Sequence, residues 1–126
     1  MIKPSEFEYE NSRLRDLYVF LDSKGYEVYF PVQHEGDCIS KYLVIKYNGT
    51  SGSMSFSSRE DLYSILCYVP SNQYSHIESF VQAVRKDMKE LEPLFLPYND
   101  QQLPTYFDDA NKGYYVEIDY KNYKFN

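Results

Sequence analysis

The stretch Ser58–Pro70, SREDLYSILCYVP, constrains the fold of this chain more than any other segment. Its residues alternate as in a β-strand, but large side chains fall on both of its faces. One face carries Leu62, Leu66 and Tyr68, and the other carries Tyr63, Ile65, Cys67 and Val69. A strand that is apolar on both sides lies inside a protein and is covered twice. We therefore predict that Tyr63, Ile65, Cys67 and Val69 form a core strand, and that the opposite face needs a cover of its own.

Two segments show the spacing of amphipathic helices. In the first, the apolar positions follow a helical repeat, namely Leu14, Leu17, Tyr18 and Leu21. This helix begins at Ser12, or at Ser5 with Glu8 completing a capping box, and Gly25 supplies a left-handed stop. In the second, Ser75 and Glu78 predict a capping box, and Pro93 ends the helix. Its apolar positions are Ile77, Phe80, Val81, Val84, Met88 and Leu91.

Further strands are predicted at Tyr26–Val32 and Lys41–Tyr47, and a closing hairpin pairs Leu103–Phe107 with Tyr114–Tyr120. Gly113 is expected to adopt a positive φ in the hairpin turn. The predicted order is α-β-β-β-α-β-β in a single domain, residues 1–126. We predict an α+β fold: a mixed, mainly antiparallel sheet of four or five strands with both helices packed on one face.

Composition limits the classes of function. The net charge of −6 disfavours tight binding to nucleic acid, which needs clustered Lys and Arg. No apolar run is long enough to span a membrane, and the start of the chain lacks the apolar core of a secretory signal. Two cysteines are too few for a disulfide scaffold, so we expect synthesis in a reducing cytoplasm.

Aromatic residues make up 18% of the chain, with fifteen tyrosines and eight phenylalanines. One small core cannot bury so many, and tyrosine suits surfaces that a partner partly covers. We therefore favour an interface role for some of them. The alternative is a tyrosine-rich sheet surface without a partner.

The sequence does not assemble a reaction centre. The densest polar cluster, HEGDC, contains His34, Asp37 and Cys38, but no second cluster has zinc-ligand spacing. Asp108 and Asp109 lie in a predicted hairpin turn, where Asp is common. We predict a non-enzymatic protein with no cofactor and no metal. A metal-dependent hydrolase centred on His34, Asp37 and Cys38 is an alternative.

Several segments resemble small tail proteins of phages and phage-like particles from Gram-positive bacteria. They are EVYFPVQHEGDCISKYLVIK, then SSREDLYSILCYVPSNQYSHIESFVQAVRKDMKEL, then PTYFDD and YKNYKF. The likeness runs from about Gly25 to the end of the chain. Its most specific pieces are Gly36–Cys38, Cys67–Pro70 and Tyr74–Ser75. The chain is similar to the tail terminator group, also called tail completion or tail-to-head joining proteins.

This resemblance implies a homo-oligomeric ring, usually of six subunits, that caps the tail tube and stops its polymerisation. The implied partners are the tail tube protein, head connector or neck proteins and, in particles with a contractile sheath, the sheath. DNA would pass through the ring without being specifically bound, and no membrane is involved. The implied location is the neck end of the virion tail, after assembly in the host cytoplasm.

Within that reading, the Gly- and Ser-rich segment Asn48–Ser58 is a candidate subunit-interface loop, ordered by assembly. Its proposed contact residues are Gly49, Thr50, Ser51, Gly52, Ser53, Met54 and Phe56. The alternative is a surface loop without a partner. Two other functions are also consistent with the sequence: another neck, head-completion or minor tail subunit, and a small acidic phage inhibitor of a host nucleic-acid-binding protein.

Overall fold

The computed structural model of this chain describes residues 12–52, 58–99 and 103–125. Its elements in chain order are α1 (Ser12–Ser23), β1 (Val28–Tyr29), β2 (Tyr42–Gly52), β3 (Ser58–Pro70), α2 (Ile77–Met88), β4 (Leu96–Asn99), β5 (Tyr106–Asp108) and β6 (Gly113–Phe125). Short 3₁₀ helices precede and follow α2, at Ser71–His76 and Lys89–Leu91. The chain is an α+β domain, as the sequence predicts.

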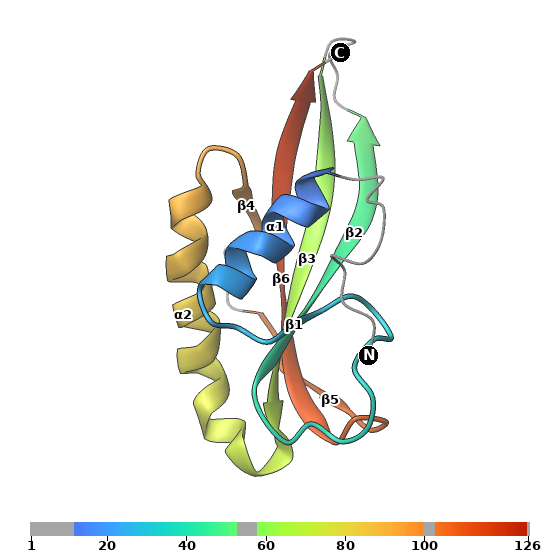
Figure 1. The fold of residues 1–126 in the computed structure, drawn as a ribbon, viewed down its shortest axis with the longest axis vertical. Coiled ribbons are helices and arrows are strands. Elements are labelled where there is room, and N and C mark those ends of the chain that lie inside the picture. The colour runs from blue at the N-terminus through green and yellow to red at the C-terminus, as the bar shows by residue number, and fades with distance from the viewer. Residues whose placement is uncertain (1–11, 53–57, 100–102, 126) are drawn as a thin grey trace.

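The strands form one sheet of six, with β3 near its centre (Figure 1). The order is β1-β2-β3-β6-β4, and β5 pairs with another part of β6. Only β1 and β2 are parallel, and the other neighbours are antiparallel. Ile65 of β3 lies between Ile45 of β2 and Ile118 of β6. The predicted strand is therefore the middle of the sheet, paired along both of its edges.

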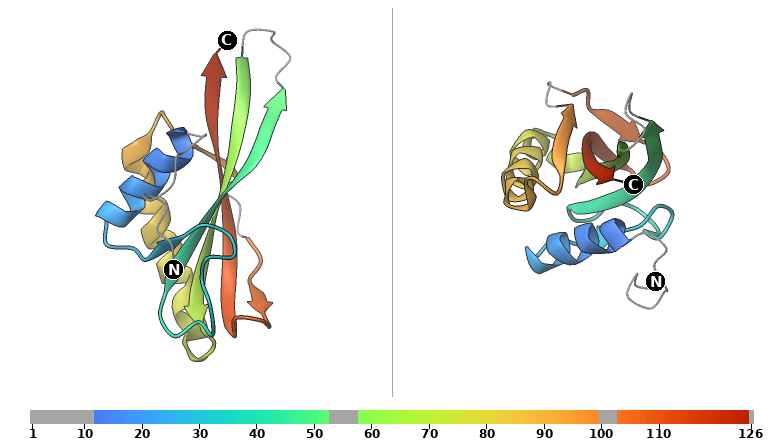
Figure 2. Two further views of the ribbon diagram at one scale, coloured as in Figure 1. Left: turned by 45° about the vertical axis from the view of Figure 1, so that its right-hand side comes forward. Right: turned by 90° about the horizontal axis from the view of Figure 1, so that it is seen from above.

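Both helices lie on one face of the sheet, as predicted (Figure 2). Leu17 and Leu21 of α1 are fully buried, and the chain leaves this helix through Gly25 at a φ of 92°. The core between helices and sheet includes Leu43, Ile45, Tyr63, Ile65, Cys67, Val69, Phe80, Val84, Phe95, Val116 and Ile118. The face that carries Tyr63, Ile65, Cys67 and Val69 is thus covered by the helices, and each of these side chains is fully buried.

The start of α2 differs from the prediction. Ser75 lies in the preceding 3₁₀ helix, and α2 begins at Ile77 without a side-chain hydrogen bond at its N-cap, His76. The hydroxyl of Ser79 donates instead to the carbonyl oxygen of His76, at 2.9 Å. The tight 3₁₀ turn after Pro70 brings the chain directly from β3 into the helix, so the capping box of Ser75 and Glu78 does not form. Five of the six predicted apolar positions are buried in α2, whereas Leu91 lies in the following 3₁₀ helix and is half-buried.

The predicted interface loop is largely strand. Gly49, Thr50, Ser51 and Gly52 belong to β2 and pair with Leu62, Asp61, Glu60 and Arg59 of β3. A bulge between Tyr47 and Gly49, where Gly49 adopts a φ of 99°, lets the strand continue. The prediction of a loop was wrong for Gly49–Gly52, because the long β3 offers backbone partners that local composition cannot reveal. The role of these residues at a subunit interface stays a prediction. Ser53, Met54 and Phe56 lie outside the described residues.

The C-terminal half also differs in detail. β4 was not predicted, because its segment LPYN has only four residues and contains a proline. The hairpin strand β5 starts at Tyr106 rather than Leu103, and Lys112, not Gly113, has the positive φ, of 52°. Gly113 is needed for space instead: a Cβ there would lie 2.8 Å from the Cβ of Cys38. Within the described residues, no helix is long and apolar enough to cross a membrane.

A charge introduced at Ile65 should prevent folding. Ile65 is fully buried at the centre of the sheet, and Ile65→Asp would cost about 4 kcal/mol or more. That is a large part of the roughly 5–15 kcal/mol that stabilises a typical domain. Soluble yield and thermal unfolding measure the effect. Val19→Asp, on an exposed site of α1, is the control and should fold. An unchanged melting curve for Ile65→Asp would show that the strand is not central.

Candidate functional site

The sheet face opposite the helices carries a row of stacked aromatic rings, which we call the aromatic ladder. Its members are Tyr42 of β2, Tyr68 of β3 and Tyr115 of β6, which the strand register places side by side. The rings of Tyr42 and Tyr68 are 4.6 Å apart and nearly parallel, and those of Tyr68 and Tyr115 are 5.1 Å apart. The ladder therefore crosses the three longest strands at one level of the sheet.

Residues 30–41, which join β1 to β2, close over one end of the ladder. The ring of His34 stacks on Tyr42 at 4.0 Å, and Tyr29 meets both rings edge-on. Farther along, the backbone N–H of Cys38 donates to the carbonyl oxygen of Asn111 at 2.6 Å. Cys38, Tyr29, Tyr42 and Tyr68 form a second buried cluster, separate from the helix-side core. The chain itself thus supplies the cover for this part of the second face.

Asp108 fastens the turn between β5 and β6 to the ladder. The hydroxyl of Tyr68 donates to Asp108 Oδ2 at 2.9 Å. The backbone N–H groups of Ala110 and Asn111 donate to Asp108 Oδ1, at 3.0 and 3.1 Å. Burial alone would raise the pKa of Asp108, but the hydrogen bonds from Asn111 and Tyr68 and from the backbone outweigh it and lower that pKa. Asp108 is therefore a structural anchor, held as a carboxylate.

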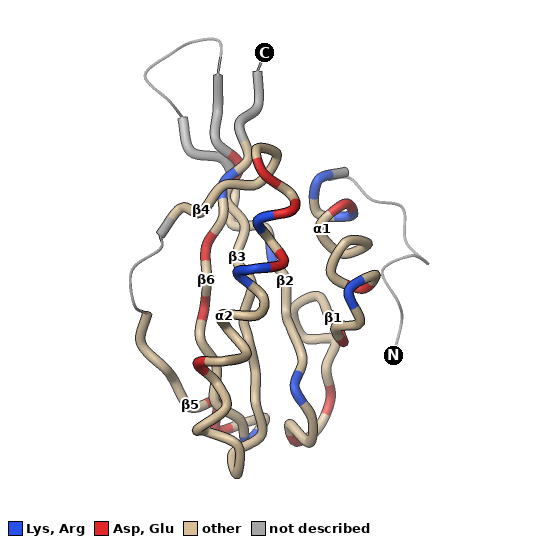
Figure 3. Tube along the Cα trace, turned by 90° about the vertical axis from the view of Figure 1, so that its left-hand side faces the viewer, with Lys and Arg blue, Asp and Glu red and all other residues tan. Residues whose placement is uncertain are grey.

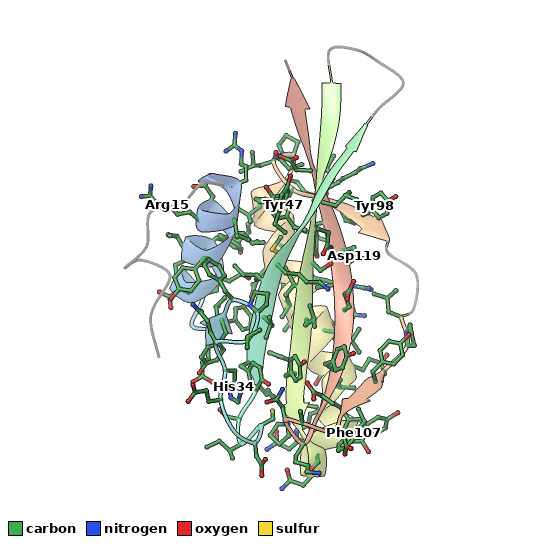
Figure 4. All side chains as sticks on the ribbon, turned by 90° about the vertical axis from the view of Figure 1, so that its right-hand side faces the viewer. Arg15, His34, Tyr47, Tyr98, Phe107 and Asp119 are labelled. Carbon is green, nitrogen blue, oxygen red and sulfur yellow. The ribbon has the colours of Figure 1, made fainter. Side chains whose placement is uncertain are left out.

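A polar row lies beyond the ladder on the same face, where Figure 4 labels Asp119 on β6. The buried hydroxyl of Ser64 lies 2.6 Å from Asp119 Oδ1 and 3.2 Å from Glu117 Oε2. It also accepts a hydrogen bond from Asn48 Nδ2, and Lys46 Nζ is 3.7 Å from Glu117 Oε1. The second face therefore changes along the strands from aromatic to polar, and its polar groups satisfy one another.

Large apolar side chains at the end of the sheet that carries the ladder are exposed, and we call them the apolar rim. Its members and their exposed fractions are Val32 (97%), Ile39 (84%), Tyr74 (54%), Tyr106 (52%) and Phe107 (45%). The ring of Tyr106 lies 5.7 Å from that of Tyr115 in the ladder. The rings of Tyr74 and Phe107 flank Tyr114, which packs against the helix-side core, so the rim lies around one end of the sheet on both of its faces. Ile39 and Val32 belong to the covering segment 30–41.

Val32 combines exposure with backbone strain. Its φ is 67°, in the left-handed region that β-branched residues rarely adopt. The N–H of Gln33 donates to the carbonyl oxygen of Phe30 at 3.2 Å, so Pro31 and Val32 occupy the middle of a turn in which Gly usually follows Pro. A conformation of this kind costs about 1–3 kcal/mol. A valine that is both strained and 97% exposed does not serve the stability of the isolated chain.

Two of the three residues suggested for metal-dependent hydrolysis, His34 and Cys38, serve the packing of segment 30–41. His34 stacks on the ladder, Cys38 is buried, and Asp37 is exposed. Among residues 12–52, 58–99 and 103–125, no group of three His, Cys, Asp or Glu side chains is placed to hold a metal ion. Burial, with the nearby charges of Glu27 and Asp108, raises the pKa of the Cys38 thiol to about 11. The reactive thiolate is therefore scarce at neutral pH.

The aromatic ladder was not foreseen from the sequence. Alternation places Tyr68 on the second face, as predicted, and the strand register places Tyr115 beside it. The signal for the ladder was the presence of tyrosine at these positions in three strands. The sequence does not give the pairing register that brings the three rings together. Comparison of the sequence with models of known protein families and with curated proteins finds no match.

Adding a methyl group at Gly113 should loosen segment 30–41. The new Cβ of Gly113→Ala would lie 2.8 Å from Cys38 Cβ and 3.0 Å from the carbonyl oxygen of Val69, a crowding that costs about 1–3 kcal/mol. We expect a lower melting temperature and faster reaction of the Cys38 thiol with a thiol reagent. Cys67, buried under the helices, is the internal control and should stay protected. Unchanged protection of Cys38 would contradict the close contact.

Stability should fall at alkaline pH. Burial raises the pKa of Cys38 to about 11 from 9.0, and those of Tyr29 and Tyr120 to about 12 from 10.0. The unfolded chain releases these protons first, so the stabilisation is complete below pH 9 and is lost as pH rises towards 12. Denaturant unfolding between pH 7 and 12 measures this. A constant unfolding free energy up to pH 12 would contradict the burial of these groups.

Proposed function

We propose that this chain is a structural, non-enzymatic subunit of a phage tail, a terminator that forms a ring on the end of the tail tube. The ring stops tube polymerisation and offers a docking surface to the head connector. The observation that carries the proposal is the apolar rim, a group of exposed large apolar side chains around one end of the sheet. Its proposed partners are neighbouring copies of this chain and the tail tube protein.

The apolar rim has the character of the centre of a protein–protein interface. Aromatic residues are enriched in such centres, and exposed apolar groups of this size are uncommon on a monomer. The stacking of His34 on Tyr42 and the anchoring of the turn by Asp108 hold the segments that carry Val32, Ile39, Tyr106 and Phe107 in one shape. Preorganised side chains lose less entropy on binding, so a rim of this kind favours association.

The fold agrees with what the resemblance to tail terminators implies, because both helices pack on one side of a small mixed sheet. The thiols of Cys38 and Cys67 have pKa values raised by burial, to about 11 and about 12, and are unsuited to nucleophilic catalysis. The acidic balance of the chain, with its net charge of −6, suits a ring through which DNA slides without being held.

The proposed mechanism is capping by shape. One surface of the subunit matches the end of the tube, and the opposite surface does not copy the docking surface of a tube subunit. Elongation therefore ends when the ring is in place. Copies that contact one another head to tail close into a ring when the rotation between neighbours is a whole-number fraction of a full turn. In this scheme the apolar rim is buried, and its exposure is a property of the free subunit only.

A charge on the rim should abolish capping without unfolding the chain. The variant Val32→Asp/Ile39→Asp changes two exposed side chains, so its melting temperature should stay close to that of the unchanged protein. The measurement adds purified protein to polymerising tube protein from the same genome and records tube lengths by electron microscopy. The unchanged protein should give short, capped tubes, and the variant should give long ones. Val19→Asp, on α1, is the matched control and should cap normally.

Two outcomes would count against this proposal. If the unchanged protein leaves tube length unaltered and binds isolated heads instead, a head-completion role replaces the terminator role. If the rim variant caps as well as the unchanged protein, the rim is not the docking surface.

A further inference from the structure

A groove runs along α2, between that helix and the outer edge of the sheet. It consists of two adjoining hollows of about 320 and 500 Å³, which share Gln82 and Arg85. Figure 3 looks onto α2, with β6 and β4 on one side of the helix and α1 on the other. β6 forms the far wall in both hollows: Ile118, Asp119 and Tyr120, which reach into the stretch paired with β4, line the smaller hollow, and Val116 lines the larger one. The smaller hollow alone has the volume of about ten water molecules.

The groove has an apolar floor and a basic wall. Buried side chains form the floor, among them Met88, Ile118 and Val116. Lys86 and Lys89 stand on the α2 side and, within the described part of the chain, have no ion-pair partner. The nearby carboxylate of Asp119 binds Ser64 on the second face, which leaves the middle of the groove basic.

The charges of α2 are segregated. Asp87 accepts a hydrogen bond from the hydroxyl of Tyr26 at 2.5 Å. Just beyond the helix, Glu90 pairs with Lys24 at 2.5 Å. The acidic groups of this stretch therefore bind the segment that follows α1, while Arg85, Lys86 and Lys89 line the groove. Glu78 and Glu92 also line it, one near each end of α2. The groove suits an occupant with acidic groups at its centre and apolar groups below them.

The first eleven residues of the chain have this composition. They precede α1 and include the run Glu6, Phe7, Glu8, Tyr9, Glu10, in which acidic and aromatic residues alternate. In an extended segment, alternate side chains point to opposite sides. Such a segment places Phe7 and Tyr9 on one side and the three glutamates on the other. The aromatic side matches the floor of the groove, and the acidic side matches its wall.

The start of α1 at Ser12 and the groove lie at opposite edges of the molecule. α1 starts over the β2 side of the sheet and ends towards α2, as Figures 1 and 2 both show. The groove borders β6 and β4, on the other side of β3. From Ser12 back to Glu8, the chain reaches at most about 14 Å, whereas α1 with its 12 residues is about 18 Å long. Glu8 therefore cannot extend from the start of α1 past its far end, which is the direction of the groove in the same chain.

We infer that the groove along α2 binds the acidic segment Met1–Asn11 of a second copy of this chain. The inference rests on the proposed function, because a segment leaving one edge and a groove on the other edge link copies head to tail. Glu8 then lies near Lys89, and Phe7 and Tyr9 cover Met88 and Ile118. The segment holds neighbouring subunits together, and the rim residues outside the groove, Val32, Ile39, Tyr106 and Phe107, are free to meet the tube, whereas Tyr74 lines the larger hollow.

Cross-linking between two full-length variants tests the inference. One chain carries Glu8→Cys, and the other, labelled with heavy nitrogen, carries Lys89→Cys. A short bismaleimide joins the added thiols, and mass spectrometry identifies the pair. The native cysteines do not interfere, because Cys38 and Cys67 are 4% and 0% exposed. The cross-linking uses the same protein concentration as the capping measurement and is carried out in the presence of tube ends. Glu8→Cys with Val19→Cys is the matched control, on an exposed site of α1.

We expect a cross-linked pair of one labelled and one unlabelled chain for Glu8→Cys with Lys89→Cys, and none for the control. The product should be lost when Lys86→Glu is added, and it should decrease as salt rises, because screening weakens ion pairs at the surface. Equal products with the control would overturn the inference. A third variant carries Glu8→Cys and Lys89→Cys in the same chain. A link that forms only within this chain, and not between copies, would also overturn the inference.

The failures of the two proposals are distinguishable. A chain that caps tubes without forming the Glu8–Lys89 link overturns the inference on the groove and leaves the proposed function in place. A chain that neither caps tubes nor forms the link overturns both. A link without capping supports the head-to-tail contact and overturns the terminator role.

Discussion

The rest of the structure depends on the burial of β3 from both sides. The helix side is closed by α1 and α2, whose apolar stripes meet Tyr63, Ile65, Cys67 and Val69. The other side is closed at one end by the aromatic ladder and segment 30–41. Because β3 is paired along both edges and covered on both faces, it fixes the position of every other element. The tight contact of Gly113 with Cys38 and the hydrogen bond of Tyr68 to Asp108 follow from this central strand.

The second face uses aromatic stacking where the first uses helices. Stacked rings cover a sheet with few residues, and each tyrosine hydroxyl can reach a polar partner at the edge. The inner side of segment 30–41 packs on the ladder, and its outer side exposes Val32 and Ile39. The strained turn at Val32 is consistent with a surface shaped for a partner. The terminator proposal accounts for these exposed groups through assembly, and the groove along α2 offers a separate contact between copies.

Local pattern predicted the helix-side half of the fold well. The buried positions of α1, α2 and β3 follow from periodicity, since amphipathic spacing determines which residues face a core. The spacing of residues within one segment did not predict the parts of the sheet that depend on pairing between segments distant in the sequence. Gly49–Gly52 extend β2 because β3 is long enough to pair with them, and β4 is held by β6. The aromatic ladder needed the register of three strands, which no single segment contains. The alternative of a metal site at His34, Asp37 and Cys38 is not supported, because His34 stacks on Tyr42 and Cys38 is buried in the second cluster.

The central claim is that this polypeptide is a building block of an assembled particle. Quantitative mass spectrometry of purified tailed particles from the source genome tests it most directly. The claim predicts that the chain is present in a fixed, small number of copies per tail, alongside the tube protein. Particles that are complete and infectious but lack this chain, while the surrounding lysate contains it, would contradict the claim.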